Sequence, residues 1–249
     1  MERRSFIAAL ALCAAALTGV GPARAQIPDT FKNLEILPKD IKKAELVSVM
    51  RGFAGALGVR CEHCHVGGDP NTLEGFDFAS DDKEPKRIAR VMMAMVQEIN
   101  KEQIPKAKIA NPVQVRCFTC HRGLKHPESL DEALRATIEK EGVPAAQKQY
   151  HDLRERYYGS GVYDFRPGPV NMVAEWLAFE RKDYDGAIAM MDLNLEFYPK
   201  LAYAHNLLGR IHEAKGDKAA AIASWKKALE LDPKDKRSQE LLQKAEGQK

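Results

Sequence analysis

The sequence lacks the features of several common protein classes. Aromatic residues make up only 7% of the 249 residues, which is few for an all-β protein. Basic and acidic residues nearly balance, 38 against 35, and no long basic tract is present, so the composition does not support nucleic-acid binding. Beyond the N-terminal segment, no apolar run is long enough to span a bilayer. The chain is nevertheless 45% hydrophobic, so we expect folded domains with a buried core.

The N-terminus has the features of an export signal. Two arginines precede a mostly apolar run at residues 5–20, which is too short for a comfortable membrane span. The tripeptide Ala-Arg-Ala that ends at Ala25 is typical of a signal-peptidase site and predicts cleavage after Ala25. Cys13 is a candidate lipoprotein cysteine, but Leu12 before it is larger than the residue such a site prefers. We expect a periplasmic protein, free or peripheral to the outer face of the inner membrane.

The cysteine count is odd, and the signal peptide accounts for the odd one. Four of the five cysteines remain after cleavage, in residues 61–65 (CEHCH) and 117–121 (CFTCH). Both segments match C-x-x-C-H, the attachment signature of c-type haem. Two cysteines three residues apart can reach the two vinyl positions of one haem edge, and the histidine then projects toward the iron. We expect two covalently bound haem c groups, with thioethers to Cys61, Cys64, Cys117 and Cys120 and with His65 and His121 as iron ligands.

Two other interpretations of the paired cysteines are possible. A Cys₄ zinc site also uses two C-x-x-C pairs, but these pairs lie far apart in the sequence, and zinc would not need a histidine after each pair. A pair of redox-active disulfides is possible in an oxidising compartment, but that chemistry is typical of a βαβ context, which the sequence does not show.

The sixth ligand of each iron decides the chemistry, because methionine or histidine closes the site for electron transfer and an open position permits ligand chemistry. Met50 lies on the helix expected before the first motif. Met92, Met93 and Met95 lie on the helix expected before the second. A methionine on a helix face more often packs in a core, but a methionine-bearing helix before each motif favours ligation.

The organisation along the chain is all-α. Apolar residues recur near the helical period at residues 40–57, where Asp40 is the expected cap, and at 81–100, where Asp81 or Asp82 is the expected cap. Residues 105–112 are expected to form a connector. Two further helices are expected at 130–140 and 145–158, followed by a Gly/Pro-rich linker at 159–169.

The C-terminal part repeats itself. Asp183 aligns with Asp217 and Pro199 with Pro233, both with the 34-residue offset of tetratricopeptide (TPR) repeats. In the better copy, Trp225 is expected to fill the space between two helices that small residues let approach. A capping helix is expected at 237–248, and the helices at 130–158 should complete the stack. Such stacks expose a concave face, with candidate lining residues Leu201, Tyr203, Asn206 and Arg210.

The haem motifs and the segments around them resemble the cytochrome c subunit of photosynthetic reaction centres. The similarity spans residues 37–124 and follows the order M…LGVRCxxCH…ARxMxxMxxxIN…CxTCHRG. It implies that each haem lies along a helix bearing its distal ligand, and that the haems relay single electrons. By position, it implies His65 and Met50 at the first iron and His121 and Met92 at the second, with Met95 as runner-up.

The resemblance also has departures. The photosynthetic subunit carries four haems and has no TPR tail, whereas this chain has two motifs. The family's fourth haem takes a histidine a few residues beyond the helix-ending asparagine, and here that position is Lys106, so His/Met pairs are expected at both irons. We therefore expect a signal peptide at 1–25, a dihaem cytochrome c domain at 26–128, a helical connector at 129–167 and TPR-like repeats with a capping helix at 168–249.

Three functions are compatible with the sequence. The first is an exported dihaem electron carrier, not an enzyme, that docks through its TPR tail to redox partner proteins such as a membrane electron-transfer complex. The second is a dihaem peroxidase, which needs an open iron and a polar catalytic residue such as His63, His126 or Glu62. The third is a TPR scaffold with accessory haems.

Overall fold

The computed structural model describes residues 27–247, so the expected signal peptide and Cys13 lie outside the described residues. The described chain forms two compact units, residues 27–50 with 60–112 and residues 51–59 with 113–247. The expected all-α class is confirmed. Within the described residues, the strands are β1 (Val66–Gly67) and β2 (Phe76–Asp77), which form an antiparallel pair of two residues each.

The first unit contains most of α1 and all of α2. Helix α1 (Lys43–Leu57) begins in this unit and ends in the second, and it stops where Gly58 takes a left-handed φ of +63°. The single turn η1 (Cys61–His63) and the β1–β2 hairpin lead to α2 (Glu84–Glu98). The chain then continues through a π-helical turn η2 (Ile99–Gln103) into α3 (Ile104–Lys106), so the connector expected from residue 105 begins later than predicted.

The prediction that Asp81 or Asp82 caps α2 is wrong. The N-cap is Lys83, and its side chain makes no capping hydrogen bond. The Asp81 carboxylate instead forms ion pairs with Arg90 at 2.9 Å and Lys86 at 3.2 Å. Two cations on α2 attract this carboxylate more strongly than the helix N-terminus does, because a full charge outweighs the partial charge of a helix end.

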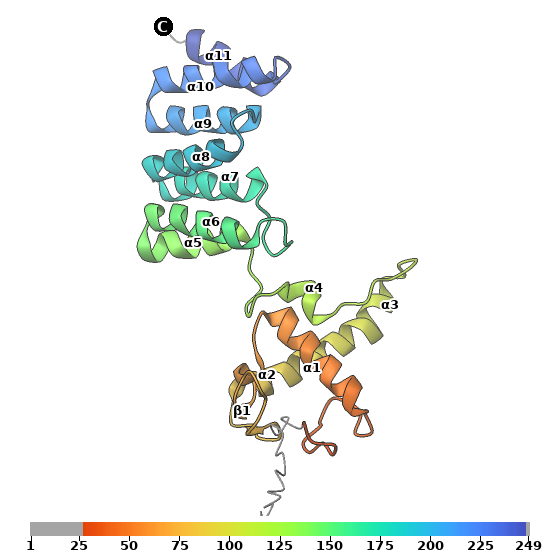
Figure 1. The fold of residues 1–249 in the computed structure, drawn as a ribbon. Helices are drawn as coiled ribbons and strands as arrows, with labels where there is room; N and C mark the ends of the chain where they lie inside the picture. The colour runs from red at the N-terminus through yellow and green to blue at the C-terminus, as the bar shows by residue number, and fades with distance from the viewer. Residues whose placement is uncertain (1–26, 248–249) are drawn as a thin grey trace, which may run out of the picture. The chain divides into compact units, whose positions relative to one another are not determined.

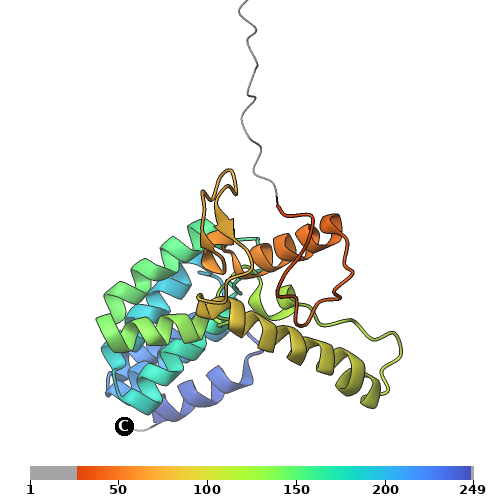
Figure 2. The same ribbon diagram turned by 90° about the horizontal axis from the view of Figure 1, so that it is seen from below.

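The second unit carries a stack of paired helices (Figures 1 and 2). After the short α4 (Cys117–His121), the helices α5 to α11 follow in chain order and lie side by side. Their bounds are α5 (Leu130–Glu141), α6 (Val143–Tyr157), α7 (Pro167–Glu175) with the π-helical turn η3 (Trp176–Arg181), α8 (Tyr184–Phe197), α9 (Ala202–Lys215), α10 (Lys218–Leu231) and α11 (Lys236–Gly247).

The 34-residue repeat has a structural basis. Asp183 and Asp217 each cap the second helix of their repeat by accepting a hydrogen bond from the backbone N–H three residues on. In the second repeat, a Cβ added to Gly209 would overlap the indole of Trp225, which is fully buried. The expectation that a small residue admits Trp225 between two helices is thereby confirmed.

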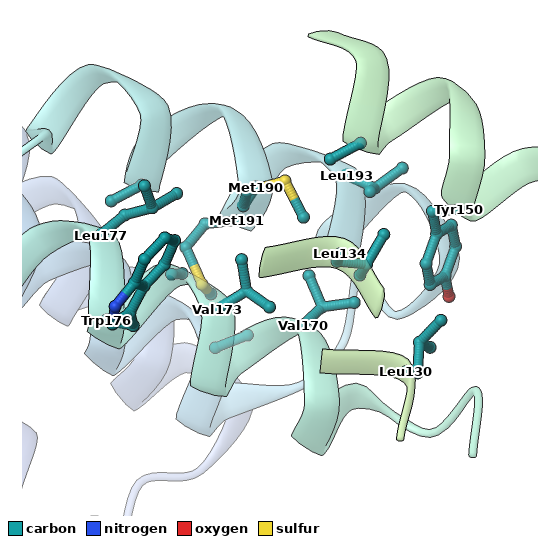
Figure 3. Close-up of a cluster of buried hydrophobic side chains, with 14 of the residues drawn as sticks. Leu130, Leu134, Tyr150, Val170, Val173, Trp176, Leu177, Met190, Met191 and Leu193 are labelled. Carbon is teal, nitrogen blue, oxygen red and sulfur yellow. The ribbon is translucent and has the colours of Figure 1, made fainter. Parts of the chain in front are cut away.

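The stack buries a continuous core from α5 through α9 (Figure 3). Leu134, Tyr150, Val173 and Met190 come from four successive helices, and all are fully buried. Helices α5 and α6 are thus part of the stack, as the sequence predicts, because two repeats alone bury too little apolar surface.

The first unit has almost no such core. Among its described residues, the buried hydrophobic side chains are Ile41 and Leu46, each 8% exposed. Helix α2 has no buried residue along its length. In the described chain, neither α1 nor α2 packs along another α-helix. An amphipathic helix that buries nothing against protein needs some other apolar group to cover it.

Candidate functional site

The first cysteine motif forms a tight helical turn. Arg60 is extended, and the turn begins at Cys61. The backbone N–H groups of Cys64 and His65 both donate to the Cys61 carbonyl, at 3.2 and 3.0 Å. Residues three and four apart in a helical turn lie on the same side of the turn. The two thiols and the imidazole can therefore bind the same ligand. The Arg60 guanidinium donates to the Pro70 carbonyl at 3.1 Å and thereby holds the following loop.

The second motif repeats this design in α4. The helix begins at Cys117, and the Thr119 hydroxyl accepts from the Arg116 backbone N–H at 3.0 Å. It ends at His121, and the next two residues are left-handed, Arg122 with a φ of +49° and Gly123 with a φ of +97°. Two consecutive left-handed residues reverse the chain directly after His121.

The four thiols are free in the described structure, and all but the exposed Cys120 are half-buried. Burial raises the pKa of Cys64 and Cys117. A zinc site needs thiolates gathered around one ion. Within residues 27–247 no three His, Cys, Asp or Glu side chains come together as a possible metal site, so the zinc alternative gains no support there.

His65 lies in an apolar and basic environment. Its ring meets Phe78 edge-on at 5.0 Å, and its Nδ1 is buried without a hydrogen-bond partner. Burial, and then the charges of Lys86 and Lys83, lower the pKa of His65. The imidazole is therefore neutral at pH 7, which is the form that binds a metal.

His121 is fixed by its own turn. Its Nδ1 lies 2.9 Å from the carbonyl oxygen of Leu124. A carbonyl can only accept, so Nδ1 carries a proton, and Nε2 is the ring nitrogen left to bind a metal. This is the usual arrangement of a metal-binding histidine, in which the second ring nitrogen donates to a backbone carbonyl.

The predicted methionines lie on the expected helices. Met50 on α1 and Met92 on α2 are half-buried, and Met95 is 41% exposed. Met50, Met92, Cys61, Cys64 and His65 belong to the first unit, whereas Cys117, Cys120 and His121 belong to the second. Ligation of iron by these methionines stays a prediction.

The helix that carries Met92 leaves its apolar side chains uncovered by protein. Ile88, Val91 and Met95 are 52%, 69% and 41% exposed, and their spacing places them on or beside the helix face that carries Met92. A soluble domain rarely exposes such a face unless it binds something. A haem offers a large flat apolar surface, so the residues of this unit fit the group that the cysteine motifs indicate.

Sequence reasoning missed a cluster of charges beside the first motif. The Lys83 ammonium donates to the Glu62 carbonyl inside the motif. Lys86 donates to the carbonyls of Phe78, Ala79 and Ser80 at 2.7–3.0 Å, which pins the segment between β2 and α2. The sequence signal was only a pair of lysines near the start of a helix, and such residues are usually solvated.

A second missed feature is a pair of glycines. A Cβ on Gly58 would overlap the backbone of Gly123, and the Gly123 N–H donates to the Ala56 carbonyl at 2.8 Å. The end of α1 therefore lies directly against the turn that follows His121. Each glycine is visible in the sequence as a helix end beside a motif, but their mutual contact is not.

The residues considered for peroxidase chemistry differ in their surroundings. His126 is exposed and His63 is half-buried. Glu62 has a buried Oε2 without a hydrogen-bond partner.

The expected concave face of the repeats is only partly available. Asn206 is 2% exposed and donates to the Ser238 hydroxyl at 2.7 Å, so it is a buried structural residue. Arg210 pairs with Glu175 at 3.3 Å, and Leu201 is half-buried. Tyr203 is 50% exposed and is the candidate most open to solvent. A shallow pocket of about 240 Å³ lies beside it, lined by Ala202, Tyr203, Asn206, Asp232, Asp235 and Arg237.

Comparison with known proteins gives two family matches. The family described as photosynthetic reaction centre cytochrome C subunit matches residues 4–164, more than half of the chain. The tetratricopeptide repeat family matches residues 202–235.

Two curated proteins are similar to the N-terminal part. Cytochrome c-554 of Chloroflexus aurantiacus is 33% identical over 107 residues, which cover 43% of this chain and 23% of that protein. The photosynthetic reaction center cytochrome c subunit of Roseobacter denitrificans is 29% identical over 104 residues, which cover 41% of this chain and 26% of that protein. The chain thus spans about a quarter of the length of each of these relatives.

Proposed function

Because the chain belongs to the photosynthetic reaction centre cytochrome C subunit family, we propose that it is an exported dihaem c-type cytochrome. It passes single electrons between redox partner proteins and is not an enzyme. The observation that carries this proposal is the near absence of a protein core around the first C-x-x-C-H turn and α2 within the described chain. The first unit exposes the apolar side of α2, and a covalently held haem would supply the missing interior.

Each motif has a defined set of roles. Cys61 and Cys64 hold the first haem by thioethers, and Cys117 and Cys120 hold the second. Each haem, when bound, supplies a one-electron iron couple. The iron ligands would be His65 with Met50 at the first haem and His121 with Met92 at the second, where Met95 is the runner-up.

An electron carrier of this kind differs from a peroxidase in that a protein side chain occupies the sixth coordination position of each iron. A methionine bound to the iron would exclude peroxide and water, so that the haem would supply one-electron chemistry. A peroxidase would instead leave that position open and pair it with a polar catalytic residue. Of the three candidate residues, His126 is exposed, and His63 and Glu62 are half-buried.

Export and docking complete the proposal. Cleavage after Ala25 would deliver the chain to the periplasm, where covalently attached haem is retained. No helix within residues 27–247 is long and apolar enough to cross a membrane. The TPR stack would dock a redox partner, for example a membrane electron-transfer complex, and exposed Tyr203 beside its pocket would lie within that contact.

The mass of the intact protein tests this proposal. Protein purified from a host that matures c-type cytochromes should begin at Gln26 and carry the mass of two haems. Replacing both cysteines of one motif by serine should remove the mass of one haem. The same loss is expected whichever of the two motifs is changed. A wild-type mass without haem, or a variant that keeps two haems, would refute the assignment of the motifs.

A further inference from the structure

Leu124 connects the second motif to the helical stack. Its backbone N–H donates to the His121 carbonyl at 2.8 Å, and its own carbonyl accepts from the His121 Nδ1–H at 2.9 Å. Its side chain is half-buried and packs against the core that runs through α5 to α9. The backbone of Leu124 is therefore hydrogen-bonded to His121, while its side chain packs against the core of the stack.

The turn that brings Leu124 back to His121 is built into the same unit. Arg122 and Gly123 are both left-handed, which reverses the chain. Gly123 is held on one side by the Ala56 carbonyl at 2.8 Å. On another side, a Cβ on Gly123 would lie 3.8 Å from a methyl group of Val162, a residue of the stack core that is 7% exposed.

This geometry has a consequence for an iron bound at Nε2. A hydrogen bond from Nδ1–H to a carbonyl fixes the orientation of the ring and makes Nε2 a stronger donor. A stronger donor stabilises the ferric state and lowers the reduction potential. The strength of that bond depends on where the Leu124 carbonyl lies, and the packing of the Leu124 side chain in the stack determines this position.

We propose that Leu124 is a positioning residue for the second haem, and that the helical stack from α5 to α9 sets the reduction potential of that haem through it. The stack is then part of the redox centre rather than only a docking tail. This inference rests on the proposed dihaem function, because it needs an iron at His121. It applies to the second motif, where the Nδ1–H of the histidine donates to the carbonyl of Leu124, whose side chain packs in the stack.

The test is a redox titration of full-length holoprotein carrying Leu124→Ala. The backbone carbonyl remains and only the anchor in the stack is lost. We expect the midpoint potential of one of the two redox steps to rise. At a fixed applied potential, the ferrous-to-ferric ratio of that haem should increase about tenfold, which corresponds to about 59 mV for a one-electron couple. The other step should stay in place. The Nδ1–H proton of one axial histidine should also exchange faster with D₂O in the NMR spectrum.

Matched variants separate positioning from general loss of stability. Leu208 packs half-buried against the same core from α9, so Leu208→Ala should lower stability without moving either potential. Leu124→Met should restore the wild-type potential. If Leu124→Ala does not fold, Val162→Ala should give the same upward shift of one step in smaller degree.

Two results would overturn the inference. One is an unchanged pair of potentials in a folded Leu124→Ala or Val162→Ala protein. The other is an equal shift in Leu208→Ala, which would show that any damage to the core moves the haem. Failure of the dihaem function itself would be seen separately, as missing haem mass in the wild-type protein.

Discussion

The methionines of this chain fall into two environments. Met190 and Met191 are fully buried among the apolar side chains of the stack (Figure 3). Met50 and Met92 are half-buried, on helices that do not pack along another helix of the described chain. The flexible thioether suits both packing and metal ligation. The surroundings therefore distinguish the two roles, whereas the residue type does not.

Methionine substitutions should separate these roles. Met92→Ala should open one iron and let its ferrous form bind CO. Met50→Ala should do the same at the other iron. Met191→Ala is the control: it should cost roughly 2–5 kcal/mol of stability through the cavity it leaves, with no CO binding. Visible spectra under CO and denaturant unfolding measure both effects, and absence of CO binding in both ligand variants would contradict the assignments.

The ion pairs of Asp81 make the free energy of unfolding of the first unit depend on pH. The Arg90 guanidinium, then the Asn33 amide and Lys86, hold the pKa of the Asp81 carboxyl well below its ordinary 3.8. Because the folded-state pKa is lower than the unfolded one, the stabilisation is complete above about pH 4 and decreases as the pH falls further.

The variant Asp81→Asn tests this dependence. It should lower the unfolding free energy of the holoprotein at pH 7, and the difference from wild type should shrink as the pH falls below about 4. Denaturant unfolding at a series of pH values measures it. Asp152→Asn, which removes an exposed pair with Lys148 on α6, is the control and should show little difference at any pH. A difference for Asp81→Asn that persists unchanged into acid would contradict the role of these ion pairs.

Among the elements, the junction of α1 with the second motif depends on glycine. Gly58→Ala should destabilise the protein, by about 1–2 kcal/mol for a left-handed alanine and roughly 1–3 kcal/mol more for its overlap with Gly123. It should also perturb the spectrum of the second haem, because Gly123 leads into the turn that holds His121. A Cβ added to Gly55 on α1 would meet no atom within 4 Å, so Gly55→Ala should be neutral or stabilising. Equal behaviour of the two alanine variants would refute the role of the junction.

The elements were predictable where one physical signal dominated. Helical periodicity located α1, α2, α5 and α6 to within a few residues, and the 34-residue offset located the repeats. Contacts between distant residues could not be read from the sequence. The Gly58–Gly123 contact, the ion pairs of Asp81 and the burial of Asn206 against Ser238 all depend on tertiary packing. The π-helical turn at residues 99–103 has no local sequence signal either, because its residues are ordinary helix formers.

Over the whole molecule, the two units differ in what stabilises them. The stack has its own core, whereas the described part of the first unit buries only Ile41 and Leu46 among its hydrophobic residues. We therefore expect that haem-free protein keeps the stack folded and leaves residues 60–112 open to hydrogen exchange. Holoprotein should protect both regions. Exchange measured by mass spectrometry checks this, and equal protection of both regions in haem-free protein would show that the first unit folds without its cofactor.

Two six-coordinate haems that transfer single electrons are the core of the proposed function. The most direct test is a potentiometric titration of the purified protein followed by its visible spectrum. We predict two one-electron steps of equal amplitude, both reversible, with low-spin spectra in each state and no change of the reduced spectrum under CO. A total amplitude that accounts for only one haem, or a ferrous haem that binds CO in the wild-type protein, would contradict this function.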